Sequence, residues 1–379
     1  MVFEQERRML ERHGHRVTIY CRSNHEVNAY SGLKRAVLVK QAVWASDSRK
    51  EFARILGREK PDIVHVHNTF VMVSPSIFSV CEESKVPIVH TLHNYRLFCP
   101  AGTFYRHGRV CEECVEHSLL RSVRHRCYRN SLSATTVTAL MLGVHRTLQT
   151  WSQPMHHYIA LSDFARGRFV QSGLPEEKVF VKPNFVYPDP GLREDKDNYA
   201  IFVGRLSPEK RVGTLLQAWE KTSNRFPLII LGGGPEHEEL QATIRRKGLS
   251  RVQLAGHSPR EKTIAAIRSA RVLIFCSEWY ENFPVTIAEA FACGTPVICS
   301  RLGAMQEIVA DGRTGLHCTP GDSDDLAKKM DWAWDHPAEL SAMGREARQE
   351  YETKYTAERN YDLLMEIYRK AAGQPWAQA

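Results

Sequence analysis

Short apolar runs alternate with helix-length segments along the chain, and this alternation constrains the fold more than any other feature. The runs begin at Arg16, Val37, Asp62, Ile88, His156 and Val179, and then at Tyr199, Leu228, Val252, Val272, Pro296 and Gly315. Strands joined by helices run parallel, because a crossover helix returns the chain to the edge of the sheet from which it left. The sequence therefore predicts an α/β protein with mainly parallel sheets.

A polar stretch separates the two series of runs. Residues 187–198 read YPDPGLREDKDN, a composition typical of a linker. A chain of 379 residues is long enough for two domains that each bury a core. We expect one Rossmann-like domain over residues 1–187 and a second over residues 188–354. The remaining segment, 355–379, has helical periodicity, and we expect it to pack back across both domains.

The N-terminal end departs from the usual order of such a domain. Residues 2–12 have the pattern of an amphipathic helix, and the apolar run RVTIYC follows from Arg16. A doubly wound domain normally opens with a strand and a glycine-rich turn before its first helix. We therefore expect the first strand and its glycine-rich turn to be missing at this end.

Composition narrows the classes of function. Apolar residues make up 43% of the chain and charged residues 25%, as in a soluble globular protein. The formal charge of +8 is spread over the length, and no basic stripe with interleaved aromatic residues predicts nucleic-acid binding. We find no apolar run long enough to span a membrane and no signal peptide. These features predict a cytoplasmic protein, whose ten cysteines are reduced thiols or metal ligands.

A cysteine-rich insertion over residues 99–127 breaks the α/β pattern. It holds Cys99, Cys111, Cys114 and Cys127 in a C-x11-C-x2-C-x12-C arrangement. A Cys-x-x-Cys pair can reach one tetrahedral ion, and two distant cysteines can complete a closed structural zinc site. With only one close pair, a loop of incidental thiols is an equal alternative.

Basic residues lie beside an apolar helical stretch. Arg121, Arg124, Arg126 and Arg129 precede the segment 132–148. Such a pair of segments can dock on the anionic inner face of a membrane as a peripheral contact. A solvated loop followed by a core helix is the alternative, and the sequence favours it.

The segment 275–301 carries the strongest chemical signal. An apolar run ends at Cys276, Glu281 follows in a loop, and Glu289 lies on a predicted helix that begins at Pro284 and ends near Gly294. This order brings both carboxylates to the carboxyl edge of a parallel sheet, where α/β folds bind ligands. A carboxylate can accept hydrogen bonds from a ribose diol, and free helix N–H groups can hold phosphate. The N–H groups in question belong to Asn282, Phe283 and Val285.

A second loop supplies cations. In FVGRLSPEKR, Gly204 ends a predicted strand, while Arg205 and Lys210 flank the start of the next helix. Two cations at this edge can clamp a diphosphate, although solvated surface cations are the commoner outcome. Histidines also end two strands of the first domain, and position favours His67 and His93 as site residues over hydrogen bonds within the strand ends.

These motifs together resemble the retaining glycosyltransferases of family 4, which have the GT-B fold of two facing Rossmann-like domains. The similar segments are E-x7-E with the AFACGTPVICS that follows, FVGRLSPEKR, RSARVLIFCSE, GAMQEIVADGRTGL, LSDFARGRF and KVFVKPN. The resemblance covers nearly the whole chain. HNYRLFCP and the later cysteines are similar to a subset of these enzymes.

The resemblance implies a role for each residue on the donor side. It implies that Arg205 and Lys210 bind the donor diphosphate and that Glu289 holds the ribose hydroxyls. The backbone around His257 and Ser258 would face the nucleotide base. The donor would be a UDP-linked or GDP-linked sugar, and the acceptor a saccharide or lipid-linked saccharide.

The reacting centre follows from the same resemblance. Glu281 would contact the transferred sugar, and His93 aligns with a histidine that the family places near it. The implied reaction transfers the sugar to an acceptor hydroxyl with retention of configuration, in the synthesis of a cell-surface polysaccharide or glycolipid. Two cations and helix N–H groups can stabilise the departing diphosphate without any cofactor.

Other functions remain open at this stage. The glycine-rich turn that the family places beside the diphosphate would precede this chain, so a truncated inactive transferase or a noncatalytic nucleotide-sugar-binding protein is an alternative. A sugar-nucleotide epimerase or a phosphorylase shares the two-domain pattern. E-x7-E does not support an epimerase, and no lysine is identifiable as an anchor for the pyridoxal phosphate of a phosphorylase.

Overall fold

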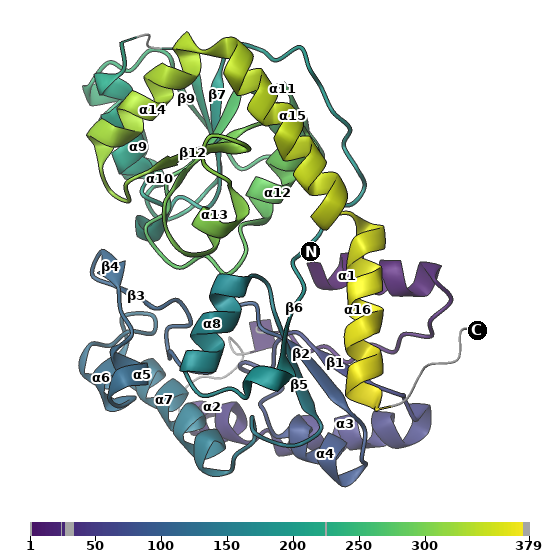
Figure 1. Ribbon diagram of the computed structural model, residues 1–379. Helices are drawn as coiled ribbons and strands as arrows, with labels where there is room; N and C mark the ends of the chain where they lie inside the picture. The colour runs from purple at the N-terminus through teal and green to yellow at the C-terminus, as the bar shows by residue number, and fades with distance from the viewer. Residues whose placement is uncertain (1, 24, 27–33, 224–225, 374–379) are drawn as a thin grey trace. The chain divides into compact units, whose positions relative to one another are not determined.

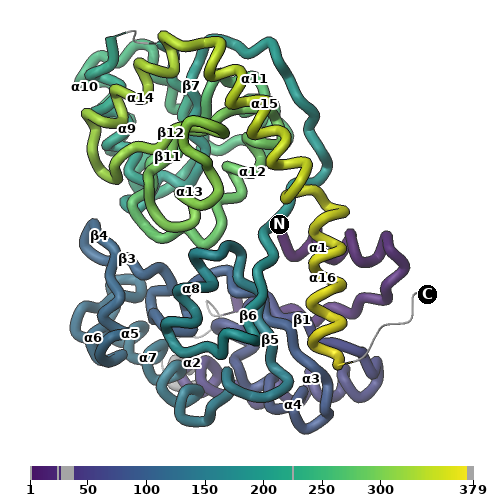
Figure 2. Tube along the Cα trace, in the orientation of Figure 1, coloured from purple at the N-terminus to yellow at the C-terminus, as the bar shows by residue number. Residues whose placement is uncertain are grey.

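The computed structural model describes residues 2–23, 25–26, 34–223 and 226–373 (Figure 1). Contacts between residues divide the chain into two compact units. Unit 1 contains Met1–Arg106, Cys111–Lys182 and Tyr361–Ala379, and unit 2 contains His107–Val110 and Pro183–Asn360. The chain thus passes into unit 2 at Pro183 and returns to unit 1 with its last helix, drawn in yellow (Figure 2).

Unit 1 is built on a four-stranded parallel sheet with the order β1-β2-β5-β6. These strands are β1 (Val64–Val66), β2 (Ile88–Thr91), β5 (His156–Ala160) and β6 (Val179–Val181). Their pairing places Val66 beside His90 and His90 beside Tyr158. All four strands were predicted from the apolar runs, and their shared direction confirms the α/β class.

Helices and a small hairpin complete unit 1. The longer helices are α1 (Val2–Arg12), α2 (Lys34–Val43), α3 (Ser46–Glu59), α4 (Ile77–Glu83), α7 (Leu132–Thr147), α8 (Asp163–Gln171) and α16 (Ala357–Ala372). The cysteine-rich insertion forms β3 (Tyr105–Arg106), β4 (Arg109–Val110), α5 (Glu113–Glu116) and α6 (Leu120–Arg124). Among the described residues, no helix combines the length and the apolar character needed to cross a bilayer.

Two predicted strands of unit 1 are wrong. The run that begins at Val37 lies inside helix α2, because a four-residue apolar run between good helix formers cannot be told from part of a helix by its pattern. The run from Arg16 is not assigned to a strand. Ile19 within it is 41% exposed, and the run pairs with none of the described strands. Hydrogen bonds to a neighbour define a strand, and an apolar pattern alone cannot supply that neighbour.

Unit 2 is built on a six-stranded parallel sheet with the order β12-β11-β10-β7-β8-β9. Its strands are β7 (Ala200–Val203), β8 (Leu228–Leu231), β9 (Val252–Gly256), β10 (Val272–Phe275), β11 (Val297–Ser300) and β12 (Gly315–Cys318). Every predicted run of this series forms a strand. The first strand, β7, pairs with the fourth, β10, so the strand order reverses between them. Ligands of such sheets bind at this reversal, beyond the carboxyl ends of the strands.

Helices cover the sheet of unit 2. They are η3 (Pro208–Lys210), α9 (Val212–Lys221), α10 (His237–Arg246), α11 (Arg260–Ser269), α12 (Val285–Ala292), α13 (Gly303–Ile308), α14 (Ser323–Asp335) and α15 (Pro337–Lys354). Phe202, Ile230, Ile274 and Ile298 on the inner strands are fully buried. This burial explains why these strands appear as continuous apolar runs and not as alternating ones.

Candidate functional site

The loops that follow β7 and β10 meet where the strand order of unit 2 reverses. Nζ of Lys210, at the end of η3, donates a hydrogen bond of 2.5 Å to Oε1 of Glu281 in the loop after β10. The backbones of the two loops are also joined, since Glu278 N–H donates to the Glu209 carbonyl at 3.0 Å. Two of the predicted site residues are therefore direct partners.

Glu281 is held by several donors on one oxygen. Besides Lys210, its Oε1 accepts hydrogen bonds from Ser277 Oγ at 2.9 Å and from Trp279 Nε1 at 2.7 Å. The residue is 6% exposed. The Lys210 ammonium also lies 4.8 Å from the centre of the Phe275 ring, within the range of a cation–π interaction. The carboxylate is thus fixed in orientation, although it is nearly removed from water.

Glu289 lies on α12 in a different environment. It is 7% exposed and accepts a hydrogen bond of 3.2 Å from Arg260 at the start of α11. Burial raises the pKa of Glu289, and the charge of Arg260 opposes this shift. Arg260 also donates to the Tyr187 carbonyl at 3.1 Å. The sequence analysis missed Arg260, although its place two residues after Ser258, at the carboxyl end of β9, was a signal.

The boundaries predicted for the helix between the glutamates are confirmed. Pro284 caps α12, which runs over Val285–Ala292, and Gly294 follows with a φ of 63°. Asn282 and Phe283 are buried just before the helix, and the Phe283 ring packs edge-on against Tyr355 with centroids 5.6 Å apart. The start of α12 is therefore rigid and lies beside Glu281 in the chain.

Glycine turns close the same edge of the sheet. Gly204 N–H donates to the Leu231 carbonyl at 3.0 Å, and Gly232 N–H donates to the Gly256 carbonyl at 2.8 Å. A Cβ atom on Gly232 would lie 1.8 Å from the Gly204 oxygen. Arg205 is exposed in this group of turns. Close backbone approach of this kind leaves main-chain groups accessible to a ligand.

His257 and Ser258 lie farther along the edge, directly after β9. His257 is exposed, and the Ser258 carbonyl accepts a hydrogen bond of 3.4 Å from Thr263 Oγ1 in α11. The structure places both residues at the carboxyl ends of the strands that carry Gly204 and Gly232, as the sequence predicted.

In unit 1 the two histidines singled out by position are direct partners. Nδ1 of His67 and Nε2 of His93 are 2.8 Å apart. Burial, and then the neighbouring His67, lower the pKa of His93 to about 3. Both rings line a small cavity of about 40 Å³ together with His90, Phe70 and Arg96.

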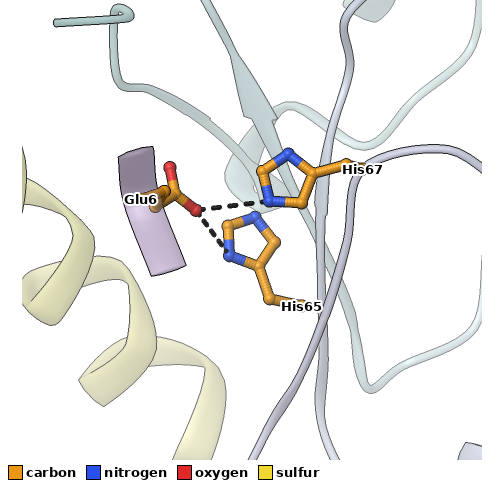
Figure 3. Close-up of side chains that lie close together, drawn as sticks. All are labelled: Glu6, His65 and His67. Carbon is orange, nitrogen blue, oxygen red and sulfur yellow. Dashed lines mark ion pairs between the residues drawn. The ribbon is translucent and has the colours of Figure 1, made fainter. Parts of the chain in front are cut away.

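A carboxylate on the first helix faces the same histidines (Figure 3). Oε1 of Glu6 in α1 lies 3.0 Å from Nδ1 of His65 and 3.4 Å from Nε2 of His67. Its other oxygen accepts a hydrogen bond of 2.9 Å from Nζ of Lys182, directly after β6. The sequence analysis missed Glu6 and Lys182. A charged residue on the inward face of α1 was the available signal.

The cysteine-rich insertion brings its thiols into one region without closing a metal site. Burial, and then the other three thiols, raise the pKa of Cys114 to about 12, while burial and Cys99 raise that of Cys127 to about 11. Among the described residues, Glu6, His65 and His67 form the one group of three potential ligands whose atoms lie within 4.8 Å of one another. No three of the sulfur atoms meet that distance.

The acidic pair near the start of α14 is structural. Asp322 accepts hydrogen bonds from the N–H groups of Asp324 at 2.9 Å and Asp325 at 3.0 Å. It is the N-cap that its place after Pro320 and Gly321 favours. The D-x-D pattern therefore does not add a ligand to the candidate site.

Two family models match successive parts of the chain. Residues 2–189 match the model described as glycosyltransferase family 4, and residues 187–350 match the model described as glycosyl transferases group 1. The two matches meet within three residues of one another, at the linker between the two series of strands.

Curated relatives match mostly over part of their length. D-rhamnosyltransferase WbpZ of Pseudomonas aeruginosa is 30% identical over 161 residues, which cover 42% of each chain. O-antigen chain mannosyltransferase C of Escherichia coli is 28% identical over 45% of this chain and 46% of its own. The chain thus matches less than half the length of these two relatives. The 2-deoxystreptamine glucosyltransferase of Streptomyces kanamyceticus is 23% identical over 87% of this chain and 83% of its own.

Solved structures share the fold over most of the chain. Alr3699/HepE of Anabaena in complex with UDP has a TM-score of 0.63 at 19% identity, covering 85% of this chain and 82% of its own. A glycosyltransferase from Rickettsia africae has a TM-score of 0.67 at 16% identity, covering 98% of this chain and 94% of its own. At these identities the likeness is one of architecture.

Proposed function

The chain belongs to the GT-B glycosyltransferases of group 1 and family 4, and from that premise we propose that it transfers a sugar from a nucleoside diphosphate donor to an acceptor hydroxyl with retention of configuration. The observation that carries the proposal is the pairing of Lys210 with Glu281 where the strand order of unit 2 reverses. It joins a cation suited to a diphosphate and a carboxylate suited to a sugar.

The donor binds at the carboxyl edge of unit 2. Arg205 and Lys210 hold its diphosphate, and the turn at Gly204 allows backbone to approach it. Glu289, oriented by Arg260, accepts hydrogen bonds from the ribose hydroxyls. The N–H groups of Asn282, Phe283 and Val285 support the sugar and its phosphate, and the backbone of His257 and Ser258 faces the base.

Lys210 and Glu281 act together during transfer. Without donor, Lys210 neutralises a carboxylate that is 6% exposed. When the diphosphate arrives, the ammonium is shared between Glu281 and the phosphate, so its charge is already in position when the leaving group gains negative charge. Glu281, held also by Ser277 and Trp279, keeps its orientation toward the transferred sugar.

His93 of unit 1 acts at the reacting sugar. Because its pKa is lowered to about 3, the ring is neutral at physiological pH and can exchange hydrogen bonds with sugar hydroxyls. The acceptor is a saccharide or lipid-linked saccharide in the synthesis of a surface polysaccharide. Support for this class comes from relatives that are named as O-antigen chain mannosyltransferases.

A donor screen tests the proposal. Thermal unfolding would be followed with UDP, GDP and their sugars, and the stabilising donor would then be offered to an acceptor panel with product analysis. We expect one nucleotide class to stabilise the protein, and a new glycosidic bond to form with the configuration of the donor. Binding without hydrolysis or transfer would favour a noncatalytic nucleotide-sugar-binding protein, and conversion of the donor without acceptor would favour an epimerase.

We also propose that the four cysteines of the insertion bind one structural zinc ion. All four lie within 29 residues, and the mutual effect of their thiols on the pKa of Cys114 supports their proximity. Binding of a zinc ion would draw the sulfur atoms together and remove the thiol protons. Metal analysis should find about one zinc per chain that is lost on substitution of Cys111 and Cys114 by serine, and a metal-free wild type would contradict the proposal.

A peripheral membrane contact is proposed for the α6–α7 surface. Leu120, Leu132, Leu140 and Leu148 are 49–73% exposed there, beside the exposed Arg121 and Arg124. Exposed apolar side chains next to arginines suit an anionic bilayer surface. The protein should sediment with vesicles rich in anionic lipid and not with neutral ones, and Leu140→Ser with Leu148→Ser should reduce this binding.

A further inference from the structure

A buried ion pair lies among the histidines of unit 1. Lys182 and Glu6 are 1% and 3% exposed in their side chains, with Nζ and Oε2 2.9 Å apart. Burial opposes ionisation of Glu6, but Lys182, His65 and His67 outweigh it and hold the pKa of Glu6 well below its usual range. Glu6 is therefore a fixed negative charge that faces two imidazole rings (Figure 3).

The contacts continue from Glu6 to His93 through His67. Oε1 of Glu6 lies 3.4 Å from Nε2 of His67, and Nδ1 of His67 lies 2.8 Å from Nε2 of His93. The two rings are also stacked, with centroids 5.1 Å apart. One carboxylate, one intermediate ring and the ring at the proposed reacting centre thus form a single chain of polar contacts.

The chemistry of the end groups determines where the hydrogens lie. A carboxylate can only accept hydrogen bonds, so Nε2 of His67 carries the hydrogen that faces Glu6. Nδ1 of a neutral His67 is then an acceptor, and Nε2 of His93 must carry the hydrogen between the rings. His93 is left with a bare Nδ1, which can accept a hydrogen bond from a sugar hydroxyl.

We propose that Glu6 is a positioning residue, which acts through His67 to hold His93 in the tautomer with a hydrogen on Nε2 and a bare Nδ1. The inference rests on the proposed function for the role of His93 in transfer, but the tautomer itself can be measured without any turnover. Lys182 serves in this arrangement to keep Glu6 ionised inside the protein.

Two other readings of the cluster are weaker. Glu6, His65 and His67 offer three ligand atoms close enough for a metal ion. Lys182 already neutralises Glu6, so a divalent ion would add two uncompensated positive charges to a buried site. A purely structural ion pair would explain the burial of Glu6 and Lys182, but it would not require the contact between Glu6 and His67.

The experiment removes both charges together, because Glu6 alone cannot be removed safely from a buried pair. Replacing such a pair by apolar residues of similar volume is often neutral for stability. The variant Glu6→Met with Lys182→Met therefore tests position against structure. Glu11→Gln is the matched control, since it lies on the same helix, is exposed and pairs only with Arg7 among the described contacts.

Ring-nitrogen NMR on histidine-labelled full-length protein gives the direct readout. In the wild type and in Glu11→Gln, His93 should show the tautomer with hydrogen on Nε2. In the double variant, a second tautomer should appear while Tm stays within a few degrees of the wild type. A wild-type His93 with hydrogen on Nδ1, or a double variant with an unchanged tautomer, would overturn the inference even if no donor or acceptor had been found.

Kinetics provides the second readout once a donor is known. The double variant should lose about 10–100-fold in kcat, the range seen when a partner that orients a histidine is removed, with donor Kd within about twofold. Glu6→Asp, which keeps the charge, should recover part of kcat. Wild-type kcat in a folded double variant would contradict a positioning role. Loss of a stoichiometric zinc ion from the His65→Ala variant would show a metal site in its place.

Discussion

At the scale of single residues, the two glutamates of the E-x7-E segment differ in what surrounds them. Glu281 receives three donors on one oxygen, whereas Glu289 receives Arg260 in a mostly apolar setting. Burial consequently raises the pKa of Glu289, and the charge of Arg260 only partly offsets this. The same residue type therefore serves two purposes, one as a fixed partner of a cation and one as an acceptor that is protonated more easily.

The raised pKa of Glu289 predicts a pH dependence of donor binding. The ionised carboxylate is the better acceptor for ribose hydroxyls, and it is present above the pKa and lost as the pH falls through it. Donor affinity, measured by titration calorimetry, should therefore begin to weaken at a higher pH than an ordinary glutamate would cause. Glu289→Gln should remove this dependence, and Glu261→Gln at an exposed position of α11 should leave it intact.

Substitution of the ion pair predicts separate effects on binding and turnover. Lys210→Ala removes a charge-assisted contact to the diphosphate and should weaken donor binding about 10–100-fold. Glu281→Ala should lower kcat about 100-fold or more, with a smaller change in donor Kd, because its contact is with the reacting sugar. Lys221→Ala, which removes an exposed cation paired with Asp324, is the control. Wild-type turnover in Glu281→Ala would contradict the site assignment.

At the scale of elements, three glycine turns determine how the strand ends of unit 2 meet. Gly232 adopts a φ of 149°, and a Cβ atom there would overlap the Gly204 carbonyl. Gly234 similarly faces the Leu206 carbonyl, 2.2 Å from an added Cβ atom. The turn after β8 can approach the turn after β7 only because neither position carries a side chain. This approach places Arg205 and Lys210 beside the loop of Glu281.

The contact between these turns predicts a contrast between adjacent glycines. Gly232→Ala should destabilise unit 2 by at least about 1–3 kcal/mol in urea unfolding, since the added atom meets backbone in a φ region that L-residues rarely adopt. It should also weaken donor binding. Gly233→Ala meets nothing within 4 Å and should have little effect on either measurement. Equal effects of the two substitutions would show that the approach of the turns is unimportant.

At the scale of the whole molecule, unit 1 depends on a segment that is remote in sequence. Helix α16 follows the whole of unit 2 in the chain, yet Tyr368 contacts His65 at 2.7 Å and Tyr361 stacks on His13 with centroids 3.7 Å apart. Leu364 and Ile367 of the same helix are buried. Unit 2, in contrast, is continuous from Pro183 to Asn360 apart from four residues of the insertion.

Removal of the last helix should therefore affect the two units differently. A chain ending at Asn360 loses the partners of His13 and His65, so the unfolding transition of unit 1 should shift to lower temperature in calorimetry. Donor binding by unit 2 should remain within about threefold of the full chain. A chain ending at Gly373 keeps α16 and is the control. Loss of donor binding together with unit 1 stability would show that the units do not fold separately.

Sequence alone determined the parallel α/β class, all the strands of unit 2, the caps of α12 and α14, and the positions of Glu281, Glu289, Arg205 and Lys210 at one edge. Each of these follows from local periodicity or from a residue at the end of an element. Tertiary structure alone decided that the run at Val37 is helical, that Arg260 meets Glu289, and that Glu6 meets Lys182 and the histidines. Such contacts join residues up to 176 positions apart, and local patterns carry no information about which distant side chains fold to the same place.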